Sequence, residues 1–228
     1  MSKGRRGSCE GYSQKGDAWL HPVVEEESIF TSKAQKILDL IVSQQVCPNL
    51  GNFYAESNVK RLNLMHYFNL LFWNKPEVLL IGEAPGKDGC AITGIPFTSE
   101  RVIRQGGLKK HFPTAQFILD GNQWERSAHF FWECVAGLHR PVVAWNVVPL
   151  HPLNDNGDNR TPEQDEIEWG MTLLPLVIDL FPGIKVVSVG KNAKSACRKL
   201  KINTIGHLNH PRRADLFQKQ FGDLFPIE

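Results

Sequence analysis

Residues Val78–Phe97 read VLLIGEAPGKDGCAITGIPF and decide the fold that we expect. The stretch opens with four apolar residues, a continuous run typical of a strand buried on both faces of a parallel sheet. The strand stops at Gly82, where a turn rich in glycine and proline begins. Ligands of open α/β sheets bind at the carboxyl ends of the strands. Glu83 and the aromatic ring of Phe97 therefore predict a site at this end of the sheet.

Helix and strand patterns alternate along the rest of the chain. Ser32 and Gln35 have capping-box spacing and predict a first helix that closes near Cys47. Thr161 is expected to cap a later helix, with Pro162 at its first position and a box completed by Gln164. Other helices are expected at 98–103, 124–136, 190–200 and after 213, and other strands at 142–148, 186–189 and 202–205. The aromatic-rich stretch 49–73 is not divided into elements. Four strands separated by helices predict a three-layer α/β/α sandwich around a four-stranded parallel sheet.

The composition is that of an ordinary globular protein. Hydrophobic residues make up 42% and charged residues 22% of 228 residues, which suits one domain at 31–228 after an extension at 1–30. No apolar run is long enough to span a bilayer and no export signal is present, so we expect an intracellular protein. The five scattered cysteines are expected to be reduced thiols. A net charge of +2 means that any affinity for DNA needs a local basic patch.

Three pieces fall on strand ends in a characteristic order. They are GEAPG and GIPF within 82–97, Asn146 inside VVAWNVVPLHP, and His210-Pro211 in HLNHPRRAD. This pattern resembles the uracil-DNA glycosylase superfamily, nearest to the family 4 group. The stretches NRTP at 159–162 and VVSVG at 186–190 extend the resemblance to roughly 77–215.

The resemblance implies a monofunctional DNA glycosylase. Such an enzyme hydrolyses the N-glycosidic bond of uracil, or of a related deaminated base, after the base is flipped out of DNA, and so initiates base excision repair. The resemblance also implies that the protein binds damaged DNA and acts as a monomer. It would be located in the cytoplasm, at the nucleoid. Family 4 holds an iron–sulfur cluster on four cysteines, but Gln44 stands where one thiol is needed and none lies near Trp169. We therefore expect no metal and no cofactor.

The resemblance also implies how a base is bound. Phe97 would stack on the base, and Gly82 and Ala84 would complete the base pocket. The amide of Asn146 offers one donor and one acceptor, which match O4 and N3–H of uracil. Gly86 stands where the best-known branch has a tyrosine that blocks the 5-methyl of thymine, so that wall is missing unless another side chain supplies it.

Two residues are expected to do the chemistry. His210 would donate a hydrogen bond to O2 of the departing base, where negative charge develops. Glu83 would polarise the attacking water or face the cationic sugar, or instead anchor its loop through backbone amides. Asp88 and Asn159 are reserve candidates for holding that water.

DNA contacts are expected from the loops and from a basic stripe. Arg212 and Arg213 would enter the minor groove beside the flipped base, and Pro85 and Pro211 would press on the DNA backbone. The segment 185–213 carries eight basic and no acidic residues, a composition that neutralises phosphates.

Other functions stay open at this point. A glycosylase for hypoxanthine or xanthine could use the same pocket. A second alternative hypothesis is a lesion-binding module without catalytic activity, because Ala84 stands where other branches keep a water-holding residue. A nucleotide-binding domain could use the turn at 82–86, although no Walker motif and no GxGxxG occurs.

Overall fold

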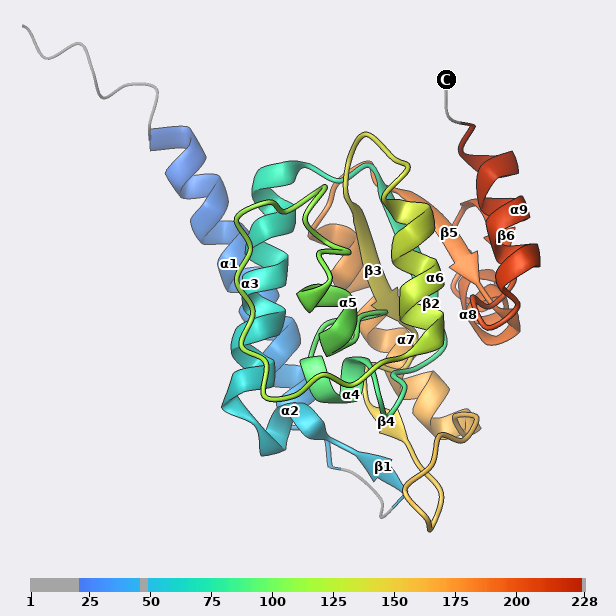
Figure 1. Cartoon of the computed structure of the whole chain (residues 1–228). Helices are drawn as coiled ribbons and strands as arrows, with labels where there is room; N and C mark the ends of the chain where they lie inside the picture. Colours follow the sequence, from blue (N-terminus) through green and yellow to red (C-terminus); the bar gives the residue numbers. More distant parts are fainter. Residues whose placement is uncertain (1–20, 46–48, 227–228) are drawn as a thin grey trace, which may run out of the picture.

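The computed structural model describes residues 21–45 and 49–226. Its centre is a parallel sheet in the order β3-β2-β5-β6, and helices cover both faces (Figure 1). The four strands are β2 (Val78–Gly82), β3 (Val142–Asn146), β5 (Lys185–Val189) and β6 (Thr204–Leu208). The predicted three-layer α/β/α sandwich is confirmed.

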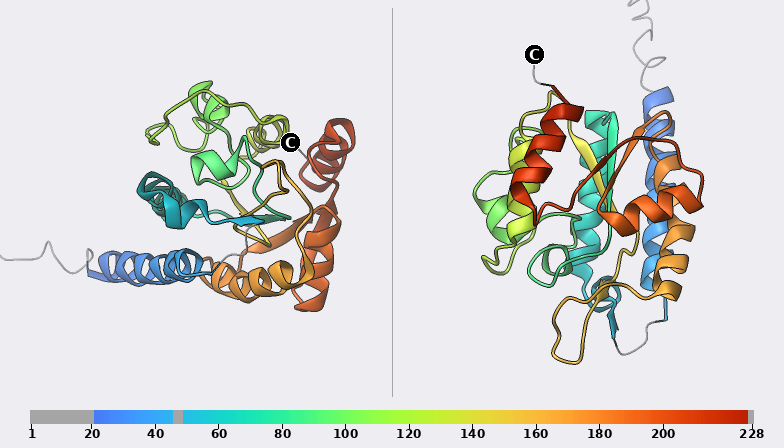
Figure 2. Two further views of the ribbon diagram at one scale, coloured as in Figure 1. Left: turned by 90° about the horizontal axis from the view of Figure 1, so that it is seen from below. Right: turned by 90° about the vertical axis from the view of Figure 1, so that its right-hand side faces the viewer.

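The helices form the two outer layers. They are α1 (His21–Val42), α2 (Phe53–Glu56), α3 (Asn58–Asn74), α4 (Cys90–Thr93), α5 (Glu100–Arg104), α6 (Arg126–Val135), α7 (Gln164–Asp179), α8 (Lys191–Lys199) and α9 (Ala214–Leu224). On one face α6 packs beside α9, and on the other α1 packs beside α7 while α8 covers β5 (Figure 2). A second, two-stranded antiparallel sheet of β1 (Leu50–Gly51) and β4 (His151–Pro152) lies outside the main sheet.

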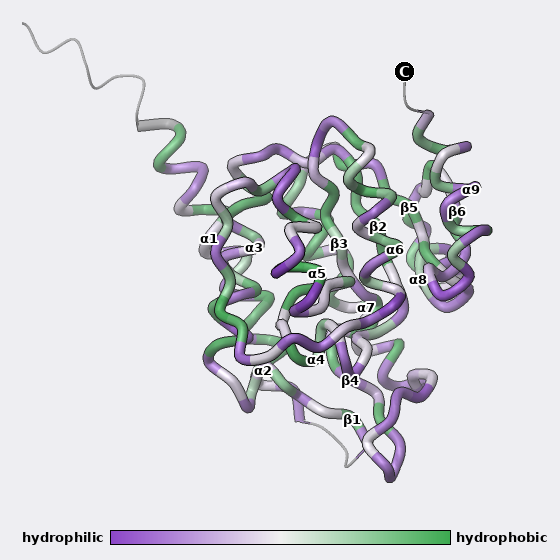
Figure 3. Tube along the Cα trace, in the orientation of Figure 1, coloured by the Kyte–Doolittle hydropathy of each residue, from purple (hydrophilic) through white to green (hydrophobic). Residues whose placement is uncertain are grey.

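The strands form because their residues are apolar on both faces. Leu79, Leu80 and Ile81 of β2 have no exposed surface, and the hydrophobic colour follows β2 and β3 into the centre of the molecule (Figure 3). β3 is an edge strand, and α3 closes its free edge. The Tyr67 hydroxyl accepts a hydrogen bond from the Ala144 N–H at 2.9 Å and donates one to the Val142 carbonyl at 3.3 Å. Backbone groups that would otherwise pair with another chain are thereby satisfied.

The topology defines one switch point. From β2 the chain moves to β3 on one side of the sheet, and then crosses to β5 and β6 on the other side. Ligands of such sheets bind where the strand order reverses. That point is the carboxyl end of β2, where Gly82 lies in register with Asn146 of β3.

Several expected boundaries are wrong. α1 begins at His21, so Ser32 and Gln35 lie inside a helix and cap nothing, and residue 30 falls within α1. The expected close at Cys47 and Pro48 lies outside the described residues. α7 is capped by Glu163 with Glu166, not by Thr161 and Pro162, because two carboxylates satisfy its first amides in a reciprocal capping box.

Other elements are shifted or were not foreseen. The fourth strand runs from 204 to 208 instead of 202–205. The undivided stretch 49–73 contains α2 and α3, which Asn52 and Ser57 cap through their side chains. No helix within 21–45 and 49–226 is both long and apolar enough to cross a membrane.

Candidate functional site

A pocket opens at the switch point of the sheet. Its cavity of about 30 Å³ has room for about two ordered waters. Ten residues line it: Glu83, Ala84, Pro85, Gly86, Cys90, Phe97, Glu125, Ser127, Asn146 and His210. Three sequence motifs that are far apart in the chain therefore meet here, as expected from their places at the carboxyl ends of β2, β3 and β6.

Phe97 forms a rigid wall of this pocket. Its backbone has φ +55°, a left-handed conformation that is uncommon for an aromatic residue and recurs at functional sites. Trp132 Nε1 holds that turn by donating to the Phe97 carbonyl at 3.0 Å. The ring stacks on Phe131 at 4.5 Å between centroids. A Cβ on Gly82 would overlap the Phe97 ring, so only glycine fits beneath it.

Asn146 is a buried amide whose donor and acceptor are both open. The residue is 4% exposed, and its Oδ1 would lie 2.8 Å from a Cβ on Gly82. Within the described part of the chain its side chain makes no hydrogen bond. A buried amide without partners is costly unless a ligand satisfies it.

His210 is held as a neutral donor. The backbone N–H of Arg212 donates to His210 Nδ1 at 3.1 Å, which leaves the ring proton on Nε2. Desolvation, and then the positive charge of Arg212, lower the pKa of this imidazole. Although its side chain is exposed at the rim, the cleft around it removes enough water to disfavour the charged form.

Glu83 lies half-buried at the same end of β2. Burial raises the pKa of its carboxyl group, and a hydrogen bond from the Asn192 side chain opposes that rise. Asn192, in the first turn of α8, was not predicted as a site residue, although it follows the end of β5 and so meets the same strand-end criterion.

Glu125 is a second carboxylate that the sequence did not reveal. It lies just before α6, and its carboxyl group occupies the space where Gly86 and Gly89 have no side chain. Burial raises the pKa of Glu125 to about 7, and a hydrogen bond from Ser127 opposes the shift. Part of the residue stays exposed, but the carboxyl end is enclosed by the loop and the pocket. The Glu125 carboxyl group therefore forms the part of the pocket wall where Gly86 has no side chain.

Asp88 is part of the loop after β2 and Asn159 contacts that loop, but neither residue lines the pocket. Asn159 Oδ1 accepts the Lys87 N–H at 2.8 Å and contacts His151 Nε2 at 2.8 Å. This acceptor is therefore engaged in holding the loop. Water holding by either residue stays a prediction.

The expected DNA contacts divide into exposed and buried groups. Arg212 and Arg213 are exposed, whereas Pro85 and Pro211 are buried. In this conformation the two prolines shape their loops and do not offer rings to a DNA backbone.

The basic stripe is also divided, contrary to expectation. Lys191 and Lys194 lie at the start of α8, beside the pocket end of the sheet. Lys185 begins β5 and therefore lies at the opposite end, as do Arg198, Lys199 and Lys201, because α8 returns toward that end. All six side chains are exposed, but only the first two accompany Arg212 and Arg213.

Among the residues that the structure describes, no group of three or more His, Cys, Asp or Glu could hold a metal ion. Cys90, Cys134 and Cys197 are free thiols. Cys9 and Cys47 lie outside the described residues.

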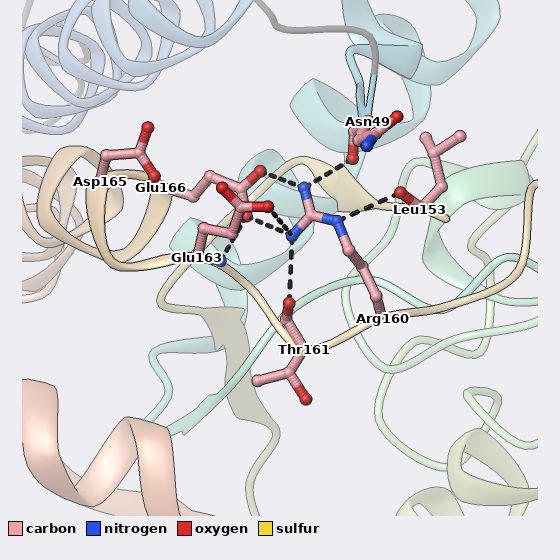
Figure 4. A network of polar contacts seen from close by, with 7 residues as sticks. All are labelled: Asn49, Leu153, Arg160, Thr161, Glu163, Asp165 and Glu166. Atoms are coloured by element: carbon pink, nitrogen blue, oxygen red, sulfur yellow. Dashed lines mark hydrogen bonds and ion pairs between the residues drawn. The ribbon is translucent and has the colours of Figure 1, made fainter. Parts of the chain in front are cut away.

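The NRTP stretch serves a structural purpose through Arg160 (Figure 4). Its guanidinium donates to the carbonyls of Asn49 at 2.7 Å and Leu153 at 3.1 Å. It also forms a bidentate ion pair with Glu166, which is 4% exposed. The network ties β1, β4 and the start of α7 together.

The fold and the pocket define a class: α/β proteins with a polar pocket at the switch point of a parallel sheet. The family model described as Uracil DNA glycosylase superfamily matches residues 72–226. The chain belongs to this superfamily, and membership supports a DNA glycosylase, a hydrolase of DNA repair.

Solved structures agree on the fold. The crystal structure of wild-type Pedobacter heparinus SMUG2 matches with 18% sequence identity and a TM-score of 0.62. The match covers 85% of this chain and 94% of that one. No curated protein matches the sequence.

Proposed function

We propose that this protein hydrolyses the N-glycosidic bond of uracil in DNA and so starts base excision repair. The observation that carries the proposal is the open amide of Asn146 beside the Phe97 ring. Its Nδ2 would donate to O4 and its Oδ1 would accept N3–H of a flipped uracil. Cytosine would present a donor at position 4 and leave buried groups unpaired, which strongly disfavours it.

The chemistry follows from charges that develop as the bond breaks. The electron pair passes to the base, and the neutral His210 would donate from Nε2 to O2, where negative charge grows. The sugar becomes cationic and takes up a water. Glu83, whose pKa burial raises, would accept the proton of that water. Neither step requires a metal or an organic cofactor.

DNA would approach the pocket end of the sheet. Arg212 and Arg213 are exposed directly after His210, where they would contact phosphates or the minor groove beside the flipped base. We propose that the protein acts as a monomer, because one chain supplies all these groups.

The test is release of uracil from a labelled single-stranded oligonucleotide in excess chelator, with alkali cleavage of the abasic product. We expect release by the wild type, and Asn146→Asp to slow it by about 10³-fold or more, because an acceptor-only side chain mismatches O4. Asn74→Asp, an exposed amide on α3, is the matched control and should keep the wild-type rate.

Three outcomes would contradict the proposal in different ways. Binding of damaged DNA without release would favour a lesion-binding module. Loss of activity under chelation would reveal a metal. Equal rates for wild type and Asn146→Asp would show that this amide does not recognise the base.

A further inference from the structure

Trp124 is a large aromatic residue that stays exposed at the pocket end of the sheet. It is 43% exposed and directly precedes Glu125, which lines the pocket. The backbone of Glu125 is extended, with φ −115° and ψ 122°, and successive side chains of an extended chain point in opposite directions. The Glu125 carboxyl group enters the cavity, so the Trp124 indole is left on the surface outside it.

The topology places this indole where a bound DNA strand would pass. α6 leads into β3, so α6 begins at the carboxyl end of the sheet, and α9 follows β6 and begins at the same end. The two helices pack side by side (Figure 2). Arg212, just before α9, interacts electrostatically with Glu125, just before α6. Trp124 and Arg212 therefore border the same pocket.

Two cations accompany the indole. Arg101 and Arg126 are both exposed, while Asp120 in the preceding loop is an exposed carboxylate. The Arg101 N–H donates to the Gln123 carbonyl at 3.0 Å, which ties the first turn of α5 to the residue before Trp124. Arg126 directly follows Glu125 and opens α6. Both charges are therefore available to phosphates near the indole.

The carboxylates of the two helices are already engaged. Glu100 accepts the N–H groups of Gly121 and Gln123 at 2.6 and 3.0 Å. Glu133 lies 3.2 Å from His129 Nε2. The His129 ring also packs against the Trp124 indole, at 6.2 Å between centroids. The indole is thus supported from its own helix and still keeps an exposed part.

An exposed indole beside cations is suited to an unpaired base. Every base has a π-face, so stacking on an aromatic ring tolerates any sequence, and nearby cations neutralise the phosphates. In a duplex the bases next to a flipped nucleotide are already paired and stacked, and freeing one of them costs energy. The surface around Trp124 therefore fits single-stranded DNA better than a duplex.

We propose that Trp124 stacks on a base next to the flipped nucleotide in single-stranded DNA, while Arg101 and Arg126 contact the phosphates of that strand. The inference rests on the proposed function, because the nucleotide held in the pocket determines which neighbouring base reaches the indole. It adds a contact outside the pocket and gives the protein a preference for single-stranded substrate.

The experiment measures DNA binding by fluorescence anisotropy, with His210→Ala as the background to prevent turnover. Trp124→Ala should weaken binding to a single-stranded uracil oligonucleotide about tenfold, the effect of losing one stacked base. Trp124→Phe keeps a ring and should recover most of that loss. The matched control is Trp73→Ala, which should change the affinity less than about twofold. Trp73 is 53% exposed, but it lies where α3 leads into β2, at the opposite end of the sheet.

Abasic residues in the oligonucleotide locate the stacked base. The bases on either side of uracil are removed one at a time, and the affinities with and without the Trp124 indole are compared. At one position the loss caused by Trp124→Ala should shrink to less than about twofold, because the base that stacks is then missing. A role of Trp124 in merely shaping α6 would cost the same at every position. The loss should also shrink when the uracil strand is annealed to its complement.

The outcomes separate the inference from the proposed function, because uracil release by the wild type is measured on its own. Equal affinities of Trp124→Ala and Trp73→Ala would overturn the inference and leave the proposed function standing. A loss that no abasic position reduces, or that is as large in the duplex, would overturn it as well. The expected binding pattern without uracil release would overturn the proposed function and support the inference.

Discussion

The pocket and the Arg160 network both bury charged and polar groups, but only the Arg160 network pairs all of them with hydrogen-bonding partners. Around Arg160, three carbonyl oxygens and the Glu166 carboxylate satisfy one guanidinium. In the pocket, the Asn146 amide makes no hydrogen bond within the described residues, and the pKa values of Glu83 and Glu125 are raised by burial.

This difference separates the groups that stabilise the fold from those available for chemistry. Buried polar groups are normally paired, and an unpaired one calls for a specific reason. Perturbed pKa values gather at functional sites for a related reason, since the same burial that costs stability tunes reactivity. Substitutions in the Arg160 network should therefore change stability, and substitutions in the pocket should change rates.

The largest effect that we expect is on the stability side of the comparison. Arg160→Ala leaves the buried Glu166 carboxylate without its ion pair, which should cost about 3–5 kcal/mol of unfolding free energy. Denaturant unfolding would measure it. The matched control is Arg140→Ala, whose ion pair with Glu77 is more than half exposed on both sides and should cost less than about 1 kcal/mol.

If Arg160→Ala left the free energy of unfolding unchanged but abolished excision, the separation between stabilising and reactive residues would be wrong at this position. Arg160 would then act in the reaction, and the resemblance of NRTP to the family stretch would have a functional meaning that its contacts do not suggest.

The next effect concerns rates inside the pocket. His210→Ala should slow single-turnover uracil excision by about 10²–10³-fold, because it removes a donor aimed at the charge that develops on the base. Glu83→Gln should cost less, since Asn192 can still hydrogen-bond to the amide. Both variants should unfold at the wild-type denaturant concentration and bind uracil-containing DNA within a few fold.

A larger loss for Glu83→Gln than for His210→Ala would reverse this ranking. Activation of water by Glu83 would then contribute more to the rate than the hydrogen bond from His210.

The sequence predicts the sheet and most of the pocket because both follow from local patterns. Apolar runs mark the strands, and Glu83, Asn146 and His210 lie at the carboxyl ends of three of them, so the parallel topology brings them together. Glu125 follows no strand. It reaches the pocket only because α6 packs on the sheet above two glycines. This is a tertiary contact, and no local sequence pattern indicates it.

The sequence does not predict the start of α1 for a related reason. The first turns of the helix carry no capping motif, and Phe30 is buried by contacts with Phe72 and Phe181, which lie far away in sequence.

The smallest expected effect concerns DNA affinity and uses the two ends of α8. Lys191 and Lys194 lie beside the pocket end of the sheet, while Arg198 and Lys199 lie up to roughly 12 Å further along the helix, at 1.5 Å per residue. Beyond one Debye length, about 10 Å at 0.1 M salt, exposed charges contribute little to the affinity for a bound phosphate.

Replacing Lys191 and Lys194 by glutamine should therefore weaken binding to uracil-containing DNA roughly three- to tenfold and reduce the slope of log affinity against log salt by about 1 to 2. The same replacement of Arg198 and Lys199 removes the same net charge from the same helix and should leave the slope unchanged. Fluorescence anisotropy over a salt series, with His210→Ala as the background to prevent turnover, would measure both. Equal losses for the two pairs would mean that DNA lies along the whole helix, and that the stripe acts as the undivided surface that the sequence suggests.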